Sequence, residues 1–270
     1  MEFYGVVGEK LSHSLSPNIH NRLFELLDIE GAYKIIEIPK DNISKLGDAL
    51  KVLGIKGVNV TIPYKQEVMK QLDFISKEAK SIGAINTIML KDNKLYGYNS
   101  DYYGFGSLLR KNNIEVKNKI AVVLGAGGAS KAVNAYLFDN GIKELYLVSR
   151  DKTSEVEVDS RVKRIDYTEL ENIKGDILVN TTPVGMYPNV GKSVVQEDII
   201  NNFDSLVDLI YNPEWTEFLK IGRKLGKKTC DGLYMLVGQA IKSEEIWQDR
   251  LIDEEIIDKI HDELRRNIIL

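Results

Sequence analysis

Small residues at a characteristic spacing follow a short apolar run near the middle of the chain. Gly125, Gly127 and Ser130 come directly after residues 120–124, which read Ile-Ala-Val-Val-Leu. This is the spacing of a dinucleotide-binding turn with serine at its third position. The first glycine makes the turn, the second admits a pyrophosphate, and the third residue lets helix and strand pack closely. N–H groups at the start of the predicted helix, 130–140, can hold phosphate oxygens without a basic side chain. Because a strand precedes the turn and a helix follows it, we predict a dinucleotide site rather than a plain strand–helix connection.

The end of the next apolar strand, which reads Glu-Leu-Tyr-Leu-Val-Ser-Arg over 144–150, indicates which dinucleotide is bound. Proteins that bind NAD usually place Asp or Glu here to hold the ribose 2′-hydroxyl, whereas Arg accommodates the 2′-phosphate of NADP. The chain has Ser149 and Arg150 at this position, which favours NADP. Two alternatives stay open. Arg150 could be an ordinary solvated side chain, and a small shift of register would bring the carboxylate of Asp151 to the ribose.

Further polar side chains stand where predicted strands end, which is where open α/β sheets bind their ligands. Ser14 and Ser16 precede a helix that Pro17 opens, so their hydroxyls could bind a carboxylate or polyol oxygens beside the helix N-terminus. Equally, Ser16 could serve only as the N-cap of that helix, and Ser14 only as a turn residue.

Thr61 and Lys65 follow a predicted buried strand, 57–62, at the start of what the sequence indicates is a helix. The positive end of a helix disfavours a further positive charge, so a lysine there is suited to giving up a proton. The alternative is a lysine that simply extends into solvent. Asn86 and Asp101 flank a predicted hairpin, and Asp101 could instead cap the helix that follows.

Composition and charge limit the classes of protein to which the chain can belong. The formal net charge of −4 disfavours nucleic-acid binding, which needs clustered Lys and Arg. The single cysteine, Cys230, excludes an internal disulfide and fits a reducing compartment. No apolar stretch reaches the ~20 residues of a membrane span, and the acidic start lacks a signal peptide's basic region. His13 and His20 have no carboxylate cluster or cysteines beside them to complete a metal site. We therefore expect a cytoplasmic protein with a small-molecule substrate, no nucleic acid, no membrane and no metal.

The elements that must position these residues alternate between strand and helix. Ahead of a connecting helix at 102–111, strands are predicted at 3–7, 33–38, 57–62, 85–90 and 94–98, with helices after Ser16, at 43–53 and near Lys65. Beyond it come strands at 176–180 and 206–210, a helix at 214–225, and amphipathic helices at 233–250 and 253–269. We expect an α/β fold in which an N-terminal α/β domain, 1–101, binds substrate and carries catalysis. A Rossmann-type NADP-binding domain, 102–235, follows it. The C-terminal helices, 236–270, are expected to return to the first domain, so that the two domains form a clamp.

Segments from nearly the whole chain also match one known pattern in order. They are SHSLSP (12–17), NVTIPYK (59–65), GAINT (83–87), NSD (99–101), GAGGAS (125–130), NTTPVGM (180–186), DLIYNP (208–213) and DGLYMLVGQA (231–240). With these motifs the chain resembles the shikimate dehydrogenase family. The resemblance implies reversible NADP-dependent reduction of 3-dehydroshikimate to shikimate, a step toward chorismate and the aromatic amino acids.

The resemblance also implies roles for particular residues. Lys65 would be the acid/base at the carbonyl that is reduced, with Asp101 as its partner. Ser14 and Ser16 would hold the substrate carboxylate, and the substrate hydroxyls would be held by Thr61, Asn86, Tyr211 and Gln239. The cofactor would be lined by Gly125, Ala126, Gly127, Gly128, Ala129, Ser149, Arg150, Leu209 and Gly232. The sequence does not decide between a monomer and a homodimer.

The chain departs from the family pattern in a few places. The family usually has Asn-Arg-Thr where this chain has Ser149-Arg150-Asp151, the helix expected over 152–161 looks short, and Ser100 stands where Thr is more usual. Two other functions therefore stay open: a NAD-using quinate/shikimate dehydrogenase of the same fold, and a non-catalytic dinucleotide-binding regulatory module. Retention of both Lys65 and Asp101 speaks against the module, which has no need of a proton-transfer pair.

Overall fold

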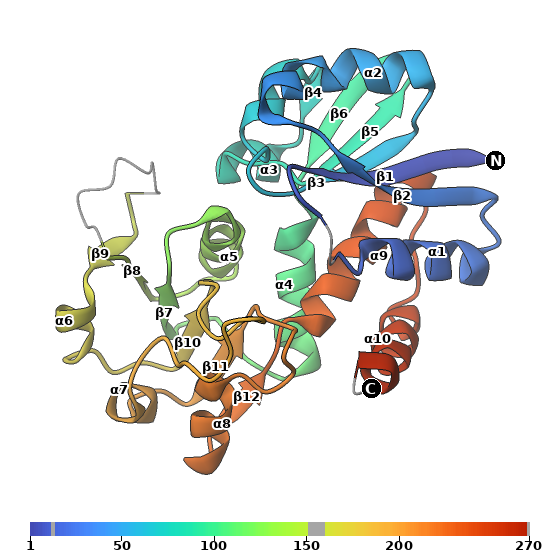
Figure 1. The fold of residues 1–270 in the computed structure, drawn as a ribbon. Coiled ribbons are helices and arrows are strands. Elements are labelled where there is room, and N and C mark those ends of the chain that lie inside the picture. Colours follow the sequence, from blue (N-terminus) through green and yellow to red (C-terminus); the bar gives the residue numbers. More distant parts are fainter. Residues whose placement is uncertain (12–13, 151–159, 269–270) are drawn as a thin grey trace. The chain divides into compact units, whose positions relative to one another are not determined.

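The computed structural model describes residues 1–11, 14–150 and 160–268 (Figure 1). The chain divides into two compact units: Met1–Gly104 with Leu236–Leu270 form the first, and Phe105–Met235 form the second. Both boundaries fall inside helices, α4 (Ser100–Lys111) and α9 (Leu233–Gln248). Among the described helices, none combines the length and the apolar character that crossing a membrane would require.

The first unit is built on a mixed six-stranded sheet in the order β2-β1-β3-β5-β6-β4. The strands are β1 (Glu2–Gly8), β2 (Gly31–Glu37), β3 (Gly57–Val60), β4 (Phe74–Ile75), β5 (Thr87–Lys91) and β6 (Lys94–Tyr98). β1 pairs in parallel with β2 and β3, whereas the hairpin strand β5 runs antiparallel to both β3 and β6. The parallel part places the ends of β1 and β3 at the same edge of the sheet, where the predicted serines and Lys65 follow them.

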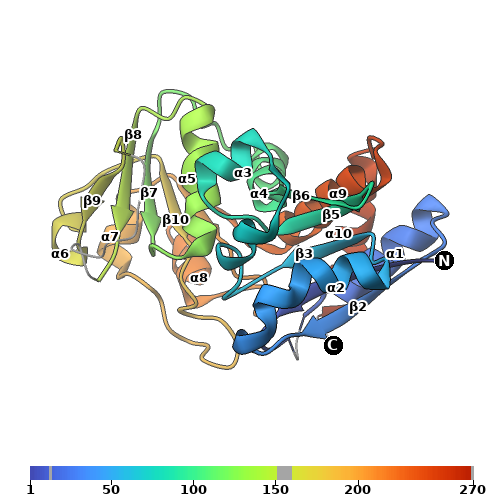
Figure 2. The same ribbon diagram turned by 90° about the horizontal axis from the view of Figure 1, so that it is seen from above.

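Helices cover both faces of this sheet (Figures 1 and 2). They are α1 (Ser16–Leu27), α2 (Leu46–Leu53), α3 (Lys77–Ile82), α9 and α10 (Glu255–Ile268), with 3₁₀ helices η1 (Lys40–Lys45) and η2 (Glu67–Gln71). Successive residues of a strand point to opposite faces, so Tyr4 and Val6 of β1 pack with Trp247 of α9, while Val7 packs with residues of α2. Residues 236–270, which hold most of α9 and all of α10, thus belong to the first unit.

The second unit holds a fully parallel six-stranded sheet in the order β12-β11-β10-β7-β8-β9. The strands are β7 (Ile120–Leu124), β8 (Glu144–Val148), β9 (Lys163–Ile165), β10 (Ile177–Asn180), β11 (Ser205–Asp208) and β12 (Lys228–Cys230). In chain order within the unit this is 3-2-1-4-5-6 read from β9, the Rossmann order, and it confirms the predicted fold class. The order reverses between β7 and β10, and ligands of such sheets bind at that point.

The helices of the second unit lie on the two faces of its sheet. Phe105 of α4 contacts Tyr136 of α5 (Gly128–Asp139) edge-on, at 5.6 Å between ring centroids. On the other face, one apolar cluster joins α6 (Tyr167–Leu170), α7 (Glu197–Asn201) and α8 (Glu217–Lys224) to the strands. The β7 and β10 strands are buried on both faces, which explains why both read as continuous apolar runs.

Some sequence expectations about elements were wrong. No α-helix opens near Lys65: a turn over residues 62–66 leads into η2, because the carbonyl of Lys65 accepts the N–H of Ile85 and so does not bond within a helix. The helix expected over 43–53 is split into η1 and α2. Ser16 does not cap α1, whose N-cap is Leu15 without a side-chain bond. Most of the segment expected to hold a short helix, 152–161, lies outside the described residues, as does position 269 of the last helix.

Candidate active site

Lys65 and Asp101 form a close ion pair in the first unit. The Nζ of Lys65 donates to Oδ2 of Asp101 at 2.6 Å, and the two side chains are 16% and 14% exposed. Partial burial strengthens the attraction compared with a surface pair, yet both groups remain reachable from solvent. The geometry therefore offers an ammonium and a carboxylate that can exchange a proton with a bound molecule.

The turn that carries Lys65 is anchored on both sides. The buried side chain of Tyr64 donates from its hydroxyl to the carbonyl of Ile38 at 2.5 Å. The backbone N–H of Tyr64 bonds the carbonyl of Thr61 at 3.0 Å, and the carbonyl of Lys65 accepts from Ile85 at 2.9 Å. Lys65 is thus held by packing and backbone bonds rather than by a regular helix.

Asp101 stands in the first turn of α4, but a neighbouring residue caps that helix. Asn99 accepts the N–H of Tyr102 through Oδ1 at 3.3 Å and donates through Nδ2 to the carbonyl of Ala84 at 2.9 Å. The capping alternative for Asp101 is therefore wrong, and its carboxylate is left for Lys65. A negative charge in the first turn is also favoured by the helix dipole.

Asn86 and Gln239 meet at Ser100, the residue before Asp101. The Oδ1 of Asn86, a residue only 3% exposed, accepts from the backbone N–H of Ser100 at 2.6 Å and from its hydroxyl at 3.1 Å. The Oε1 of Gln239, which is 8% exposed, lies 3.3 Å from the same hydroxyl, whose single proton the two amide oxygens share. Asn86 and Gln239 are 153 positions apart in the sequence, yet both contact Ser100 beside the ion pair.

The hydroxyl-bearing residues of the first unit lie at the ends of β1 and β3. Ser14 and Ser16 are half-buried, and Oγ of Ser14 accepts the N–H of Ser16 at 3.3 Å. Thr61 is also half-buried, and its N–H bonds the carbonyl of Val7 at the end of β1 at 2.9 Å. Their neighbours Ser12 and His13 lie outside the described residues. Tyr211 belongs to the second unit, so its place beside the substrate stays a prediction.

The dinucleotide turn in the second unit has the geometry that its glycines predict. Gly125 has φ +100°, and a Cβ there would lie 2.7 Å from Cγ2 of Thr182, so only glycine fits. Gly127 is the N-cap of α5 without a side-chain hydrogen bond, and a Cβ on Gly127 or Gly128 would meet nothing within 4 Å. Ser130 is 2% exposed and donates to the carbonyl of Gly127 at 2.7 Å. The space beside Gly127 and Gly128 is open, and the N–H groups at the start of α5 have no side-chain cap from Gly127. This arrangement fits a pyrophosphate.

Other predicted cofactor residues lie in this turn or follow further strands of the same parallel sheet. Gly232 lies directly on Leu209, because a Cβ on Gly232 would be 2.0 Å from the Leu209 carbonyl oxygen. Ser149 follows β8 half-buried and bonds the carbonyl of Ile165 through its N–H at 3.3 Å, whereas Arg150 is exposed. Asp151, the alternative ribose partner, lies outside the described residues. Ala126 and Ala129 are half-buried within the turn and the first turn of α5.

The sequence analysis missed two buried polar networks. In the second unit, Asp208 accepts from Asn180, Thr216 and the N–H of Ile210 at 2.7–3.1 Å, and burial raises its pKa to about 7. In the first unit, Asn59 of β3 joins a set of buried hydroxyls behind Asn86. Asn59 and Asp208 interrupt or end apolar strands, and that is the signal that could have identified both.

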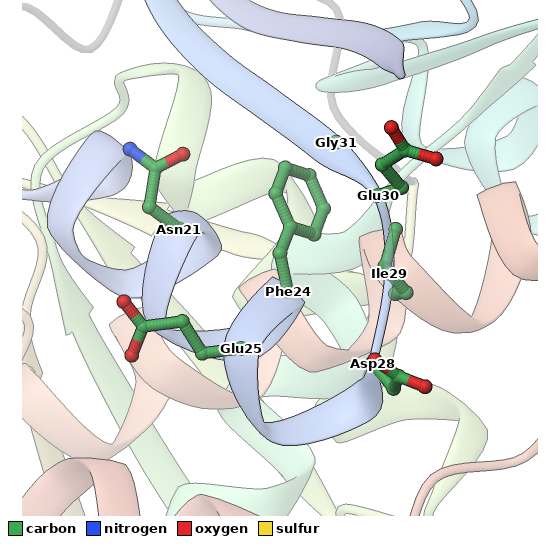
Figure 3. Close-up of a pocket in the computed structure, with 7 residues that line it drawn as sticks. All are labelled: Asn21, Phe24, Glu25, Asp28, Ile29, Glu30 and Gly31. Atoms are coloured by element: carbon green, nitrogen blue, oxygen red, sulfur yellow. The ribbon is translucent and has the colours of Figure 1, made fainter.

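A surface hollow at the end of α1 contains none of the predicted site residues (Figure 3). It is lined by Asn21, Phe24, Glu25, Asp28, Ile29, Glu30 and Gly31. Its carboxylates disfavour an anionic ligand such as a dinucleotide or a carboxylic acid. Among the described residues, no group of three or more His, Cys, Asp or Glu side chains could hold a metal ion.

Comparisons with known proteins agree with one another. A family model described as the shikimate dehydrogenase substrate binding domain matches residues 6–88. A curated protein of Clostridium beijerinckii named shikimate dehydrogenase (NADP(+)) is 62% identical over 257 residues, which cover 95% of each chain. A crystal structure of shikimate dehydrogenase 1 from Peptoclostridium difficile has a TM-score of 0.93 at 62% identity and covers 99% of both chains. A structure of shikimate 5-dehydrogenase from Thermus thermophilus in complex with NADP(H) and shikimate has a TM-score of 0.88 at 31% identity, covering 97% of this chain and 99% of that one.

Proposed function

The chain belongs to the shikimate dehydrogenase family, and we propose that it catalyses the reversible NADPH-dependent reduction of 3-dehydroshikimate to shikimate. The observation that carries this proposal is the 2.6 Å contact between Lys65 and Asp101, beside the amides of Asn86 and Gln239. A relative of the same fold has been crystallised with NADP(H) and shikimate together, which supports the choice of both ligands.

The residues of the first unit have distinct parts in the proposed reaction. When bound, the reduced nicotinamide supplies a hydride to the carbonyl carbon, and negative charge then grows on the carbonyl oxygen. The Lys65 ammonium stabilises that charge by a hydrogen bond and transfers a proton to the oxygen, which completes the new C–O–H group. The Asp101 carboxylate holds the ammonium in place, and because both side chains are partly exposed, solvent can return the proton to Lys65.

Substrate recognition is assigned to groups with complementary chemistry. Ser14 and Ser16 would hold the substrate carboxylate through hydroxyls close to the start of α1, where the helix dipole favours a negative charge. Thr61, Asn86 and Gln239, together with Tyr211 from the second unit, would bind the ring hydroxyls. A small polyhydroxylated acid suits this mixture of donors better than an apolar ligand.

The cofactor is assigned to the second unit. The turn Gly125–Ala129 would hold the pyrophosphate at the N-terminus of α5, and Leu209 and Gly232 would line the same site. Ser149 and the exposed Arg150 would bind the 2′-phosphate that distinguishes NADP from NAD. The proposal extends to a cytoplasmic monomer or homodimer with no nucleic-acid or membrane partner, supported by the charge and the single cysteine.

The test is the initial rate of change of nicotinamide absorbance with purified protein, using shikimate or quinate, each with NADP or NAD. Fast turnover only with shikimate and NADP is the expected result. Comparable rates with quinate or NAD would instead assign the protein to the broader-specificity, NAD-using enzymes of this fold. Dinucleotide binding without turnover of any pair would favour a regulatory module and contradict the proposal.

A further inference from the structure

A set of buried polar side chains lies behind Asn86 and Gln239, and the proposed reaction makes no use of it. We call this set the polar core: Asn59, Thr87, Ser100 and Ser243, which are 6%, 0%, 0% and 0% exposed. Buried amides and hydroxyls destabilise a fold unless they are hydrogen-bonded. The polar core occupies a place where apolar side chains would pack well, so we asked which neighbouring groups it positions.

The polar core ties four elements of the first unit together. Nδ2 of Asn59 donates to Oγ of Ser243 at 2.8 Å and to Oγ1 of Thr87 at 3.2 Å. The hydroxyl of Ser100 lies 3.0 Å from that of Thr87 and 3.2 Å from that of Ser243. The four residues belong to β3, β5, α4 and α9, so α9 is bonded directly to the segment that carries Asp101 of the ion pair.

Ser100 determines which end of the Asn86 amide faces outward. Its backbone N–H can only donate, and it lies 2.6 Å from the inner atom of the Asn86 amide. That inner atom must be the acceptor, Oδ1, because the reversed amide would set two donors against each other. The Ser100 and Thr87 hydroxyls add two further contacts to the same oxygen, both at 3.1 Å. Nδ2 of Asn86 is then the outer atom. This nitrogen donates to none of the described residues. Because it is not fully buried, it can reach a bound molecule.

Gln239 is oriented by the same logic. The carbonyl of Leu236 can only accept, and it receives Nε2 of Gln239 at 3.0 Å. Oε1 is therefore the atom that faces the Ser100 hydroxyl, at 3.3 Å. The second N–H of Nε2 has no partner among the described residues. Both amides of the site are thus turned by fixed backbone groups, with Ser100 bonded to each.

We propose that Ser100 is a positioning residue whose hydroxyl holds the amides of Asn86 and Gln239 in the orientation that the Ser100 N–H and the Leu236 carbonyl favour. Through its N–H and hydroxyl, backed by Thr87, Ser243 and Asn59, it leaves the nitrogens of Asn86 and Gln239 to donate to substrate oxygens. Acceptance of substrate hydroxyl protons then falls to the carboxylate of Asp101, the next residue. This inference rests on the proposed function and specifies the kind of bond each amide makes.

The test compares Ser100→Ala and Ser243→Ala with Ser100→Thr. Loss of one hydroxyl should raise KM for shikimate about three- to tenfold while kcat and KM for NADP change little, because a neutral hydrogen bond contributes modestly. Ser100→Thr keeps the hydroxyl and should retain a wild-type KM. Ser76→Ala is the matched control: Ser76 is a buried serine of the same unit that caps α3, so its loss should lower Tm and leave KM unchanged.

A double-mutant cycle separates positioning from general destabilisation. If Ser100 acts through Gln239, Ser100→Ala should raise KM less in a Gln239→Ala background than in the wild type. The proposal about Ser100 would be overturned if the wild type turns over shikimate but Ser100→Ala leaves KM unchanged. It would also be overturned if the effects of Ser100→Ala and Gln239→Ala on KM are fully additive. Absence of that turnover in the wild type would instead refute the proposed function, and with it the substrate role given to Ser100.

Discussion

Asn99 accepts the N–H of Tyr102 at the start of α4, and this leaves the carboxylate of the neighbouring Asp101 to Lys65. An aspartate at the start of a helix often serves as its N-cap. Here Asn99 caps the helix, and Asp101 forms the ion pair with Lys65. The arrangement frees one carboxylate for chemistry without leaving the helix end uncapped.

Replacement of Asp101 by Asn should therefore affect catalysis more than folding. The variant keeps the shape of the side chain but leaves Lys65 without its charged partner, so we expect kcat to fall about a hundredfold while Tm changes little. Asp48→Asn, an exposed aspartate in the first turn of α2, is the matched control and should behave as wild type. A normal kcat with a raised KM would show that Asp101 only binds substrate.

Replacement of Ser14 by Ala should mainly weaken substrate binding. The hydroxyl assigned to the substrate carboxylate is lost, so KM for shikimate should rise about tenfold while kcat stays within a few-fold of wild type. Steady-state kinetics with varied shikimate measure this effect, and Ser44→Ala, an exposed serine of the same unit, is the control. An unchanged KM for shikimate would remove Ser14 from the carboxylate site.

Replacement of Arg150 by Ala should separate the two dinucleotides. An arginine–phosphate bond is charge-assisted, so its loss should raise KM for NADP about ten- to a hundredfold while KM for NAD hardly moves. Lys220→Ala removes an exposed positive charge from the same unit and controls for long-range electrostatics. Equal effects of Arg150→Ala on both dinucleotides would exclude a 2′-phosphate contact.

The buried carboxyl of Asp208 should make the stability of the second unit depend on pH. Burial raises its pKa to about 7 against the opposing effect of its three hydrogen bonds, whereas an aspartate in an unfolded chain titrates near 4. Folding then takes up a proton between these values. The contribution of Asp208 to the free energy of unfolding should therefore be fully present below about pH 4, fall as pH rises, and be lost above about pH 7, a change of up to about 4 kcal/mol.

Asp208→Asn should flatten this dependence. Denaturant unfolding at several pH values can be followed by Trp215, the tryptophan of the second unit, in a Trp247→Phe background. Asp204→Asn, an exposed aspartate of the same unit, should keep the wild-type slope. A slope that is the same with and without Asp208 would assign the pH dependence to other groups.

Local patterns predicted the second unit well because its signals are local. The apolar run of β7, the positive-φ turn at Gly125 and the helix after it lie within one continuous segment. The order of the strands then follows from the usual rules for parallel sheets. Alternation of strands and helices likewise predicted the fold class of the first unit.

The expectations that failed depended on contacts far away in sequence. The segment around Lys65 reads as the start of a helix, but Ile85 takes the Lys65 carbonyl, and the Tyr64 hydroxyl bonds Ile38. The polar core joins Asn59 to Ser243, and no local pattern indicates such a pairing. The roles of the individual site residues were suggested by motif resemblance and stay predictions until variants are measured.

The most direct test of the central claim is the effect of Lys65→Ala on kcat and KM, with Lys70→Ala, an exposed lysine of η2, as the control. If Lys65 transfers the proton to the carbonyl oxygen, kcat should fall about 10²- to 10⁴-fold while KM for shikimate changes only a few-fold. The control should match the wild type. A Lys65→Ala variant with wild-type kcat and a strongly raised KM would contradict the account and make Lys65 a binding residue only.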